Sequence, residues 1–178
     1  KLKNISGRDT LTGLPRATLL DRHLHHMAKE VQTYGWYVGL IIADIDGFGT
    51  LNRKLGYSEA DRLLTDVAER FSNCFTKDMF IARTGPDSFA ACVPKAGKAV
   101  MEAMSQRAAD ALSYEYSPRT SDSSVSVSVS IGCVYTHVNR KVLLLTGEAE
   151  KAVLDARSDG PGTCIVRKID LSLQQNNR

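Results

Sequence analysis

One nearly continuous apolar run constrains the fold of this chain more than any other feature. Residues 39–43, GLIIA, carry no polar side chain, and Asp44 and Asp46 follow closely. This pattern is typical of a strand that is covered on both faces. Residues 18–31 and 58–75 show the apolar spacing of helices that could provide such a cover. The sequence therefore predicts a sheet with helices packed against it.

The rest of the chain alternates between helical and strand-like segments. We predict helices at residues 18–31, 58–75, 98–112 and 143–157, and strands at residues 37–43, 79–82, 89–93, 125–134 and 164–166. The polar residues 114–124 are expected to form a loop. The middle of this order is a split β-α-β-β-α-β unit, the ferredoxin-like arrangement. We therefore predict an α/β (α+β) fold, with a central mixed five-stranded sheet flanked by helices.

Composition excludes several classes of function. The chain has 178 residues, 43% of them hydrophobic and 24% charged, which fits one ordinary soluble domain. A net charge of +3 with interspersed signs argues against a nucleic-acid partner. No apolar run approaches the ~20 residues of a membrane span, and the start lacks a signal-peptide segment. The four cysteines form no CxxC pair, so we expect reduced thiols and a cytoplasmic location.

A turn between two of the short predicted strands carries the main chemical signal. Residues 83–89, RTGPDSF, form this turn and place Asp87 at its tip. Because Asp44 stands at the end of an earlier strand, the two carboxylates can meet over one edge of the sheet. Such a pair suits a hard cation that holds phosphates. Pro86 and Ser88 are unusual residues for a loop that performs chemistry.

Six segments carry a family resemblance. They are DTLTGLP at residues 9–15, DIDGF at 44–48, Asn52 with Gly56 and Asp61, RTGPDSF at 83–89, VSIG at 129–132, and AEKA at 149–152 with Arg157. In this order they resemble the GGDEF family, the diguanylate cyclase domains that join two GTP molecules into cyclic di-GMP. The resemblance extends from about residue 9 to residue 166. It implies the fold of nucleotide cyclase and polymerase palm domains, and a homodimer whose half-sites face each other.

The resemblance also implies roles for individual residues. Metal ligands would be Asp44, the Ile45 carbonyl and Asp87, and Asp87 would also be the catalytic carboxylate that helps to deprotonate the attacking hydroxyl. The nucleotide-binding residues would be Asn52, Asp61, Phe48, Gly85 and Arg157. Mg²⁺ would accompany a bound nucleotide. Taken singly, these positions have simpler explanations, because an Asp at a strand end is often a turn former and Asn52 could be a solvated helix residue.

The sequence departs from the family pattern where phosphates and metal would bind. Pro86 replaces a glycine, which fixes φ and removes an N–H donor. Ser88 replaces a glutamate, so a carboxylate ligand is lost. Gly49 replaces a lysine, and Arg157 stands at the position of another lysine with a different reach. The arginine of the family's product-inhibition motif is also absent upstream of Asp78.

These departures lead to three hypotheses. The first is a degenerate, catalytically inactive GGDEF domain, which serves as a regulatory or dimerisation module in cyclic di-GMP signalling, with GTP as a candidate ligand. The second is an active or weakly active cyclase, and the third is a structural domain that binds no nucleotide. We expect the domain at residues 9–168, with linkers at 1–8 and 169–178. The second linker would lead to another domain, such as an EAL domain, and a sensor or EAL domain would be the neighbouring partner.

Overall fold

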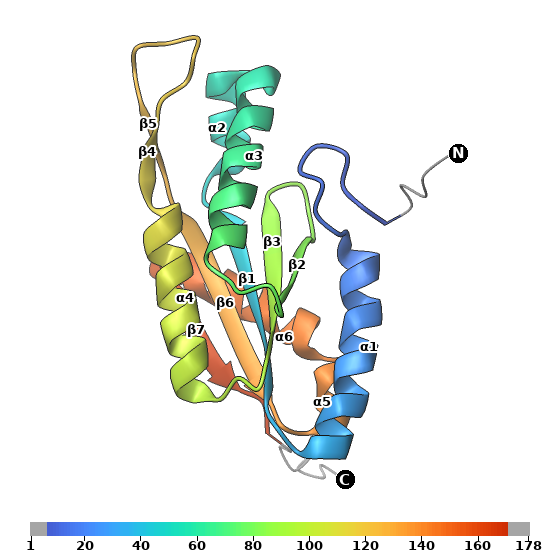
Figure 1. The fold of residues 1–178 in the computed structure, drawn as a ribbon. Helices are drawn as coiled ribbons and strands as arrows, with labels where there is room; N and C mark the ends of the chain where they lie inside the picture. Colours follow the sequence, from blue (N-terminus) through green and yellow to red (C-terminus); the bar gives the residue numbers. More distant parts are fainter. Residues whose placement is uncertain (1–6, 171–178) are drawn as a thin grey trace, which may run out of the picture.

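The computed structural model describes residues 7–170, in which a mixed five-stranded sheet lies between two layers of helices (Figure 1). The sheet has the order β2-β3-β1-β6-β7. Its strands are β1 Val38–Ile45, β2 Phe80–Arg83, β3 Ser88–Pro94, β6 Val129–Thr136 and β7 Cys164–Lys168. The helices are α1 Ala17–Tyr34, α2 Phe48–Leu55, α3 Tyr57–Asn73, α4 Lys98–Leu112, α5 Asn139–Val142 and α6 Leu145–Asp159. The predicted fold class is confirmed.

The apolar run of β1 forms the centre of the sheet. β1 pairs antiparallel with β3 on one side and with β6 on the other, and β7 adds to β6 in parallel. Alternate residues of β1 face different helical layers. Leu40 and Ile42 pack with α1, α5 and α6, whereas Ile41 and Ala43 pack with α3 and α4. The continuous apolar pattern thus reflects burial on both faces, as predicted.

Gly132 in β6 allows α6 to approach the sheet closely. A Cβ atom at this position would lie 2.1 Å from the backbone oxygen of Ala149 and 2.7 Å from the backbone nitrogen of Val153. Only a residue without a side chain fits this contact. The close packing holds α6 against β6 and so fixes where the end of α6 lies relative to β1.

Four details of the predicted secondary structure were wrong. Residues 48–55 form α2, a helix too short to be evident from apolar spacing, whose N-cap Gly47 has a φ of 63°. Residues 125–134 are two strands, because β5, Val125–Val127, leaves the main sheet to pair with β4, Tyr114–Tyr116. The expected loop at residues 114–124 therefore begins with a strand. The expected helix at 143–157 is preceded by the separate short α5.

The ends of the expected domain are only partly described. Most of the two expected linkers, residues 1–6 and 171–178, lies outside the described residues. Residues 8–16, here named the opening turn, fold back on β2, because the backbone nitrogen of Arg83 donates to the carbonyl of Pro15 at 2.8 Å. Within residues 7–170, no helix has the length and apolar character needed to cross a membrane.

Candidate functional site

The predicted site residues gather at one end of the sheet. The end of β1, the start of α2, the β2–β3 turn and the opening turn all lie at this end (Figure 1). Residues 83–89, the signature loop, are joined to β1 by a hydrogen bond from the Ile45 nitrogen to the Asp87 carbonyl at 3.1 Å. Asp44 lies opposite Ser88 in the β1–β3 register. The hairpin therefore brings Asp87 beside the end of β1.

The Asp44 carboxyl is in an environment that disfavours its charge. Burial is the largest influence and raises its pKa, and repulsion from the Asp87 carboxylate raises it further. Arg157 opposes both effects, and the pKa rises to about 6. A carboxyl perturbed by burial and by a neighbouring carboxylate is a frequent mark of functional sites.

Arg157 forms an ion pair with Asp44. It lies in the last turn of α6, and its guanidinium Nη2 contacts Asp44 Oδ1. The two side chains line a cavity of about 250 Å³ together with Ser88 and Glu150. The arginine therefore provides the positive charge next to the half-buried carboxylate.

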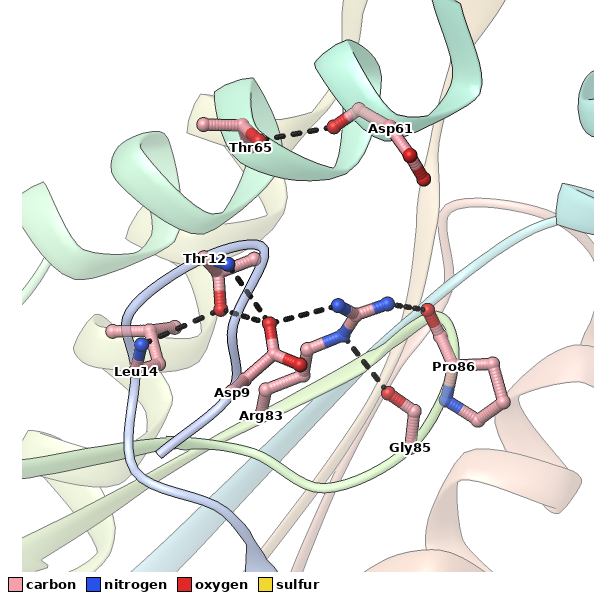
Figure 2. Close-up of polar contacts among 8 residues, drawn as sticks. All are labelled: Asp9, Thr12, Leu14, Asp61, Thr65, Arg83, Gly85 and Pro86. Carbon is pink, nitrogen blue, oxygen red and sulfur yellow. Dashed lines mark hydrogen bonds and ion pairs between the residues drawn. The ribbon is translucent and has the colours of Figure 1, made fainter. Parts of the chain in front are cut away.

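The signature loop is organised by Arg83, which makes three separate contacts (Figure 2). Its Nη1 donates to Asp9 Oδ2 at 2.9 Å, its Nε to the Gly85 carbonyl at 3.1 Å, and its Nη2 to the Pro86 carbonyl at 2.5 Å. Loop carbonyls thus point at the guanidinium. Because the side chain of Arg83 is only 12% exposed, these contacts hold the loop in one shape.

Asp9 connects the opening turn to the signature loop. Its carboxylate accepts hydrogen bonds from the backbone nitrogen and the hydroxyl of Thr12, at 2.8 and 2.7 Å, in addition to the Arg83 contact (Figure 2). Burial raises the pKa of Asp9, but these hydrogen bonds and the Arg83 charge outweigh burial and lower it to about 2. Arg83 is thus the ion-pair partner of Asp9.

Two backbone amides of the signature loop are used within the hairpin. The nitrogens of Thr84 and Gly85 both donate to the Ser88 carbonyl, at 2.9 and 3.4 Å. The Ser88 hydroxyl lies 3.1 Å from the Thr84 hydroxyl, so either can donate to the other. Pro86 is exposed and has no N–H. At residues 84–86 the loop therefore has no free backbone N–H for a phosphate group.

Asp46 is held by hydrogen bonds from neutral donors, whereas Asp44 is paired with an arginine. The Asp46 carboxylate accepts hydrogen bonds from the hydroxyls of Ser128 and Ser130, at 2.7 and 2.6 Å, and from the nitrogen of Gly162 at 2.9 Å. These contacts join the end of β1 to the β5–β6 junction and to the loop after α6. Ser128 is also the residue at which the two strands separate, which explains the break in the strand predicted at residues 125–134.

The predicted nucleobase-reading residues lie on the two helices after β1. Asn52 is half-buried in α2, and its backbone carbonyl accepts from the Gly56 nitrogen at 2.9 Å. Asp61 is exposed on α3, and in Figure 2 its carboxylate is directed from the helix toward the side on which the signature loop lies. Phe48 starts α2 and is half-buried against the core. These residues belong to α2 and α3, whereas the Asp44–Arg157 pair joins the end of β1 to α6.

The residues present do not fit a complete site for a divalent cation. Among residues 7–170, no three side chains of His, Cys, Asp or Glu are placed to hold a metal together. Asp44 is paired with Arg157, and the position that carries a glutamate in the resembled family has the Ser88 hydroxyl. Mg²⁺ requires near-octahedral oxygen ligation and retains several waters, so two carboxylates beside a guanidinium make a poor site.

Sequence reasoning missed a buried carboxylate that supports α3. Glu59 is 4% exposed and accepts hydrogen bonds from Arg62, from the Tyr116 hydroxyl at 3.0 Å and from the Arg119 nitrogen at 3.2 Å. Burial raises its pKa, but these donors outweigh burial and lower it. The contacts connect the start of α3 to the β4–β5 ribbon. The (i, i+3) spacing of Glu59 and Arg62 was the only local signal of this network.

Comparisons with known proteins agree with this architecture. The chain matches the family described as "Diguanylate cyclase, GGDEF domain" over residues 6–163. It is 25% identical over 162 residues to "Cyclic di-GMP phosphodiesterase PdeR" of Escherichia coli K12, which corresponds to 91% of this chain and 24% of that protein. It is 29% identical over 132 residues to "Bifunctional diguanylate cyclase/cyclic di-GMP phosphodiesterase MucR" of Pseudomonas aeruginosa, covering 74% of this chain and 19% of that protein. The chain thus spans about a quarter or less of the length of these two relatives.

A solved structure provides the corresponding comparison of folds. The GGDEF domain of DgcB from Caulobacter crescentus, crystallised in complex with c-di-GMP, superposes with a TM-score of 0.87. The match covers 93% of this chain and 98% of that chain at 20% sequence identity. At this identity the likeness shows a shared fold.

Proposed function

The chain belongs to the GGDEF family of diguanylate cyclase domains. We propose that it is a catalytically inactive member of this family that regulates cyclic di-GMP signalling. The observation that carries the proposal is the state of the signature loop. The amides of Thr84 and Gly85 are used within the hairpin, Pro86 lacks an N–H, and Ser88 provides a hydroxyl instead of a carboxylate. Catalysis of phosphoryl transfer depends on metal and donor contacts of this kind.

The size of the expected loss supports inactivity. Removing one preorganised electrostatic contact in an active site costs about 3 kcal/mol, or about 10² to 10³ in rate. This chain departs from the family at three such positions, Gly49, Pro86 and Ser88. Although contributions of this kind do not simply add, their joint loss is expected to reduce turnover below the level of detection.

We further propose that the domain retains a nucleotide site. Asn52 and Asp61 would read the guanine edge, and Phe48 and Gly85 would lie against the nucleotide. Arg157, whose Nη2 contacts Asp44, would direct its remaining N–H donors to phosphate. The domain would then exert its regulatory role through a homodimer or through a neighbouring domain. A phosphodiesterase domain is one candidate for such a neighbour, because the names of two relatives include this activity.

Calorimetric titration with GTP tests nucleotide binding. We expect binding that weakens about tenfold or more in Asp61→Ala, because a hydrogen bond to a charged group is lost. Glu69→Ala is the matched control, since it removes an exposed carboxylate from the same helix about 12 Å further along. Absence of binding at millimolar GTP would contradict a retained site and favour a purely structural domain.

A further inference from the structure

Arg157 is the positive partner of the Asp44 carboxylate at the end of β1. Asp44 lies at the end of β1, and its side chain is only 18% exposed. A carboxylate this far out of water needs a positive partner. In the described structure that partner is Arg157, which reaches it from the last turn of α6.

The surroundings leave little room for a second cation. The 250 Å³ cavity beside the pair is lined by Asp44, Glu150 and Arg157 among its charged side chains, and Asp87 adds a negative charge nearby. A guanidinium in contact with Asp44 already neutralises one carboxylate. A divalent ion at the same carboxylate would meet a fixed positive charge within a few ångströms, in surroundings less polar than bulk water.

The position of Arg157 is set by the fold and not by a flexible loop. Gly132 holds α6 closely against β6, and β6 is the neighbour of β1 in the sheet. The helix therefore carries Arg157 to the end of β1. Unlike an ammonium group, a guanidinium can hold a carboxylate with a planar set of donors and is always charged.

We propose that Arg157 takes the place of a divalent cation at Asp44 and keeps such a cation out of this site. The domain then folds with its site closed to metal, and any nucleotide it holds binds without one. Removal of the guanidinium leaves the carboxylates of Asp44 and Asp87 near each other without a positive partner. Carboxylate groups of this kind bind Mg²⁺.

The test is a metal titration without nucleotide. The wild-type chain and Arg157→Gln are first freed of metal with a chelator and then titrated with MgCl₂ at constant ionic strength, with heat and melting temperature as readouts. We expect Arg157→Gln to bind Mg²⁺ at least about tenfold more tightly than the wild type, because a unit charge near the ion is removed. Asp44→Asn combined with Arg157→Gln should abolish the gain.

Arg167→Gln is the matched control. Arg167 makes an exposed ion pair with Asp155 of α6 at 2.7 Å, so this variant loses the same charge at another place next to the same helix. It should behave as the wild type does. Comparison of each variant with and without metal removes the effect of any general loss of stability.

Two results would overturn the proposal. One is equal Mg²⁺ affinity in the wild type and Arg157→Gln, and the other is no detectable binding by either. The inference refines the proposed function, since it concerns the site beside the signature loop. Because the titration contains no nucleotide, its outcome is independent of whether the domain binds GTP or makes cyclic di-GMP.

Discussion

Arg83 and Asp9 lie 74 residues apart in the sequence and form the contact on which the shape of the signature loop depends. The arginine binds two carbonyls of the loop, and the aspartate holds the opening turn through Thr12. Both side chains are largely shielded from water, at 12% and 15% exposed. The pair thus joins two segments of the family pattern into one unit, even though the loop itself has changed.

This contact makes part of the stability dependent on pH. The pKa of Asp9 is lowered in the folded state to about 2 from an ordinary value of 3.8. Its stabilising effect is therefore complete above the ordinary value and is lost as the pH falls toward 2. We expect Asp9→Asn to lose about 1 kcal/mol at neutral pH, since solvent reaches and screens part of the pair.

Urea denaturation between pH 7 and pH 2 measures this effect. The difference in unfolding free energy between the wild type and Asp9→Asn should shrink as the pH falls below about 4. Asp21→Asn, on the exposed side of α1, is the control and should show no such trend. A difference that stays constant across this range would show that the Asp9 charge does not contribute.

At the scale of elements, the contact between α6 and β6 requires glycine. A Cβ atom at Gly132 would lie 2.1 Å from the Ala149 oxygen, so Gly132→Ala must push the helix away from the sheet. We expect a loss of about 1–3 kcal/mol or more, as is usual for overpacking. Chemical denaturation followed by circular dichroism measures the loss.

Gly147→Ala provides the control for this prediction. Gly147 lies within α6, and nothing is within 4 Å of the position that a Cβ atom would take. Alanine is the better helix former, so this variant should be neutral or more stable by up to about 1 kcal/mol. Equal effects of the two substitutions would contradict the close approach described here.

Sequence reasoning succeeded for elements whose signals are local. The helix predicted at residues 98–112 has these same bounds in the structure, and the strand at 37–43 was identified from its apolar run. It failed at residues 125–134, because the alternation of Val and Ser continues from β5 into the start of β6 while the pairing partner changes at Ser128. Periodicity indicates a strand but does not indicate which strand it joins.

The candidate site was also predictable only where its residues lie in elements with local signals. The approach of Asp87 to Asp44 followed from a strand end and a hairpin tip. The pairing of Asp44 with Arg157 did not, because these residues are 113 positions apart and a long-range ion pair leaves no local pattern. The roles of Arg83 and Glu59 were missed for the same reason, since their partners come together only in the fold.

At the scale of the whole molecule, the fold and family are retained while the parts that handle phosphates have changed. The five-stranded sheet, the two helical layers and the opening turn are all present. In contrast, two amides of the signature loop donate within the hairpin, and Arg157 contacts Asp44, the carboxylate expected to bind metal. We propose that a scaffold preserved in this way acts by binding a ligand, through a homodimer or through a neighbouring domain.

The most direct test of this account is the formation of cyclic di-GMP by the purified chain. The protein is incubated at high concentration with GTP and Mg²⁺, and the product is quantified by chromatography and mass spectrometry beside Asp87→Ala. We predict no product above the level of that variant, because the metal and phosphate contacts of the reaction are incomplete. Steady formation of cyclic di-GMP that disappears in Asp87→Ala would contradict the account and identify the chain as an active cyclase.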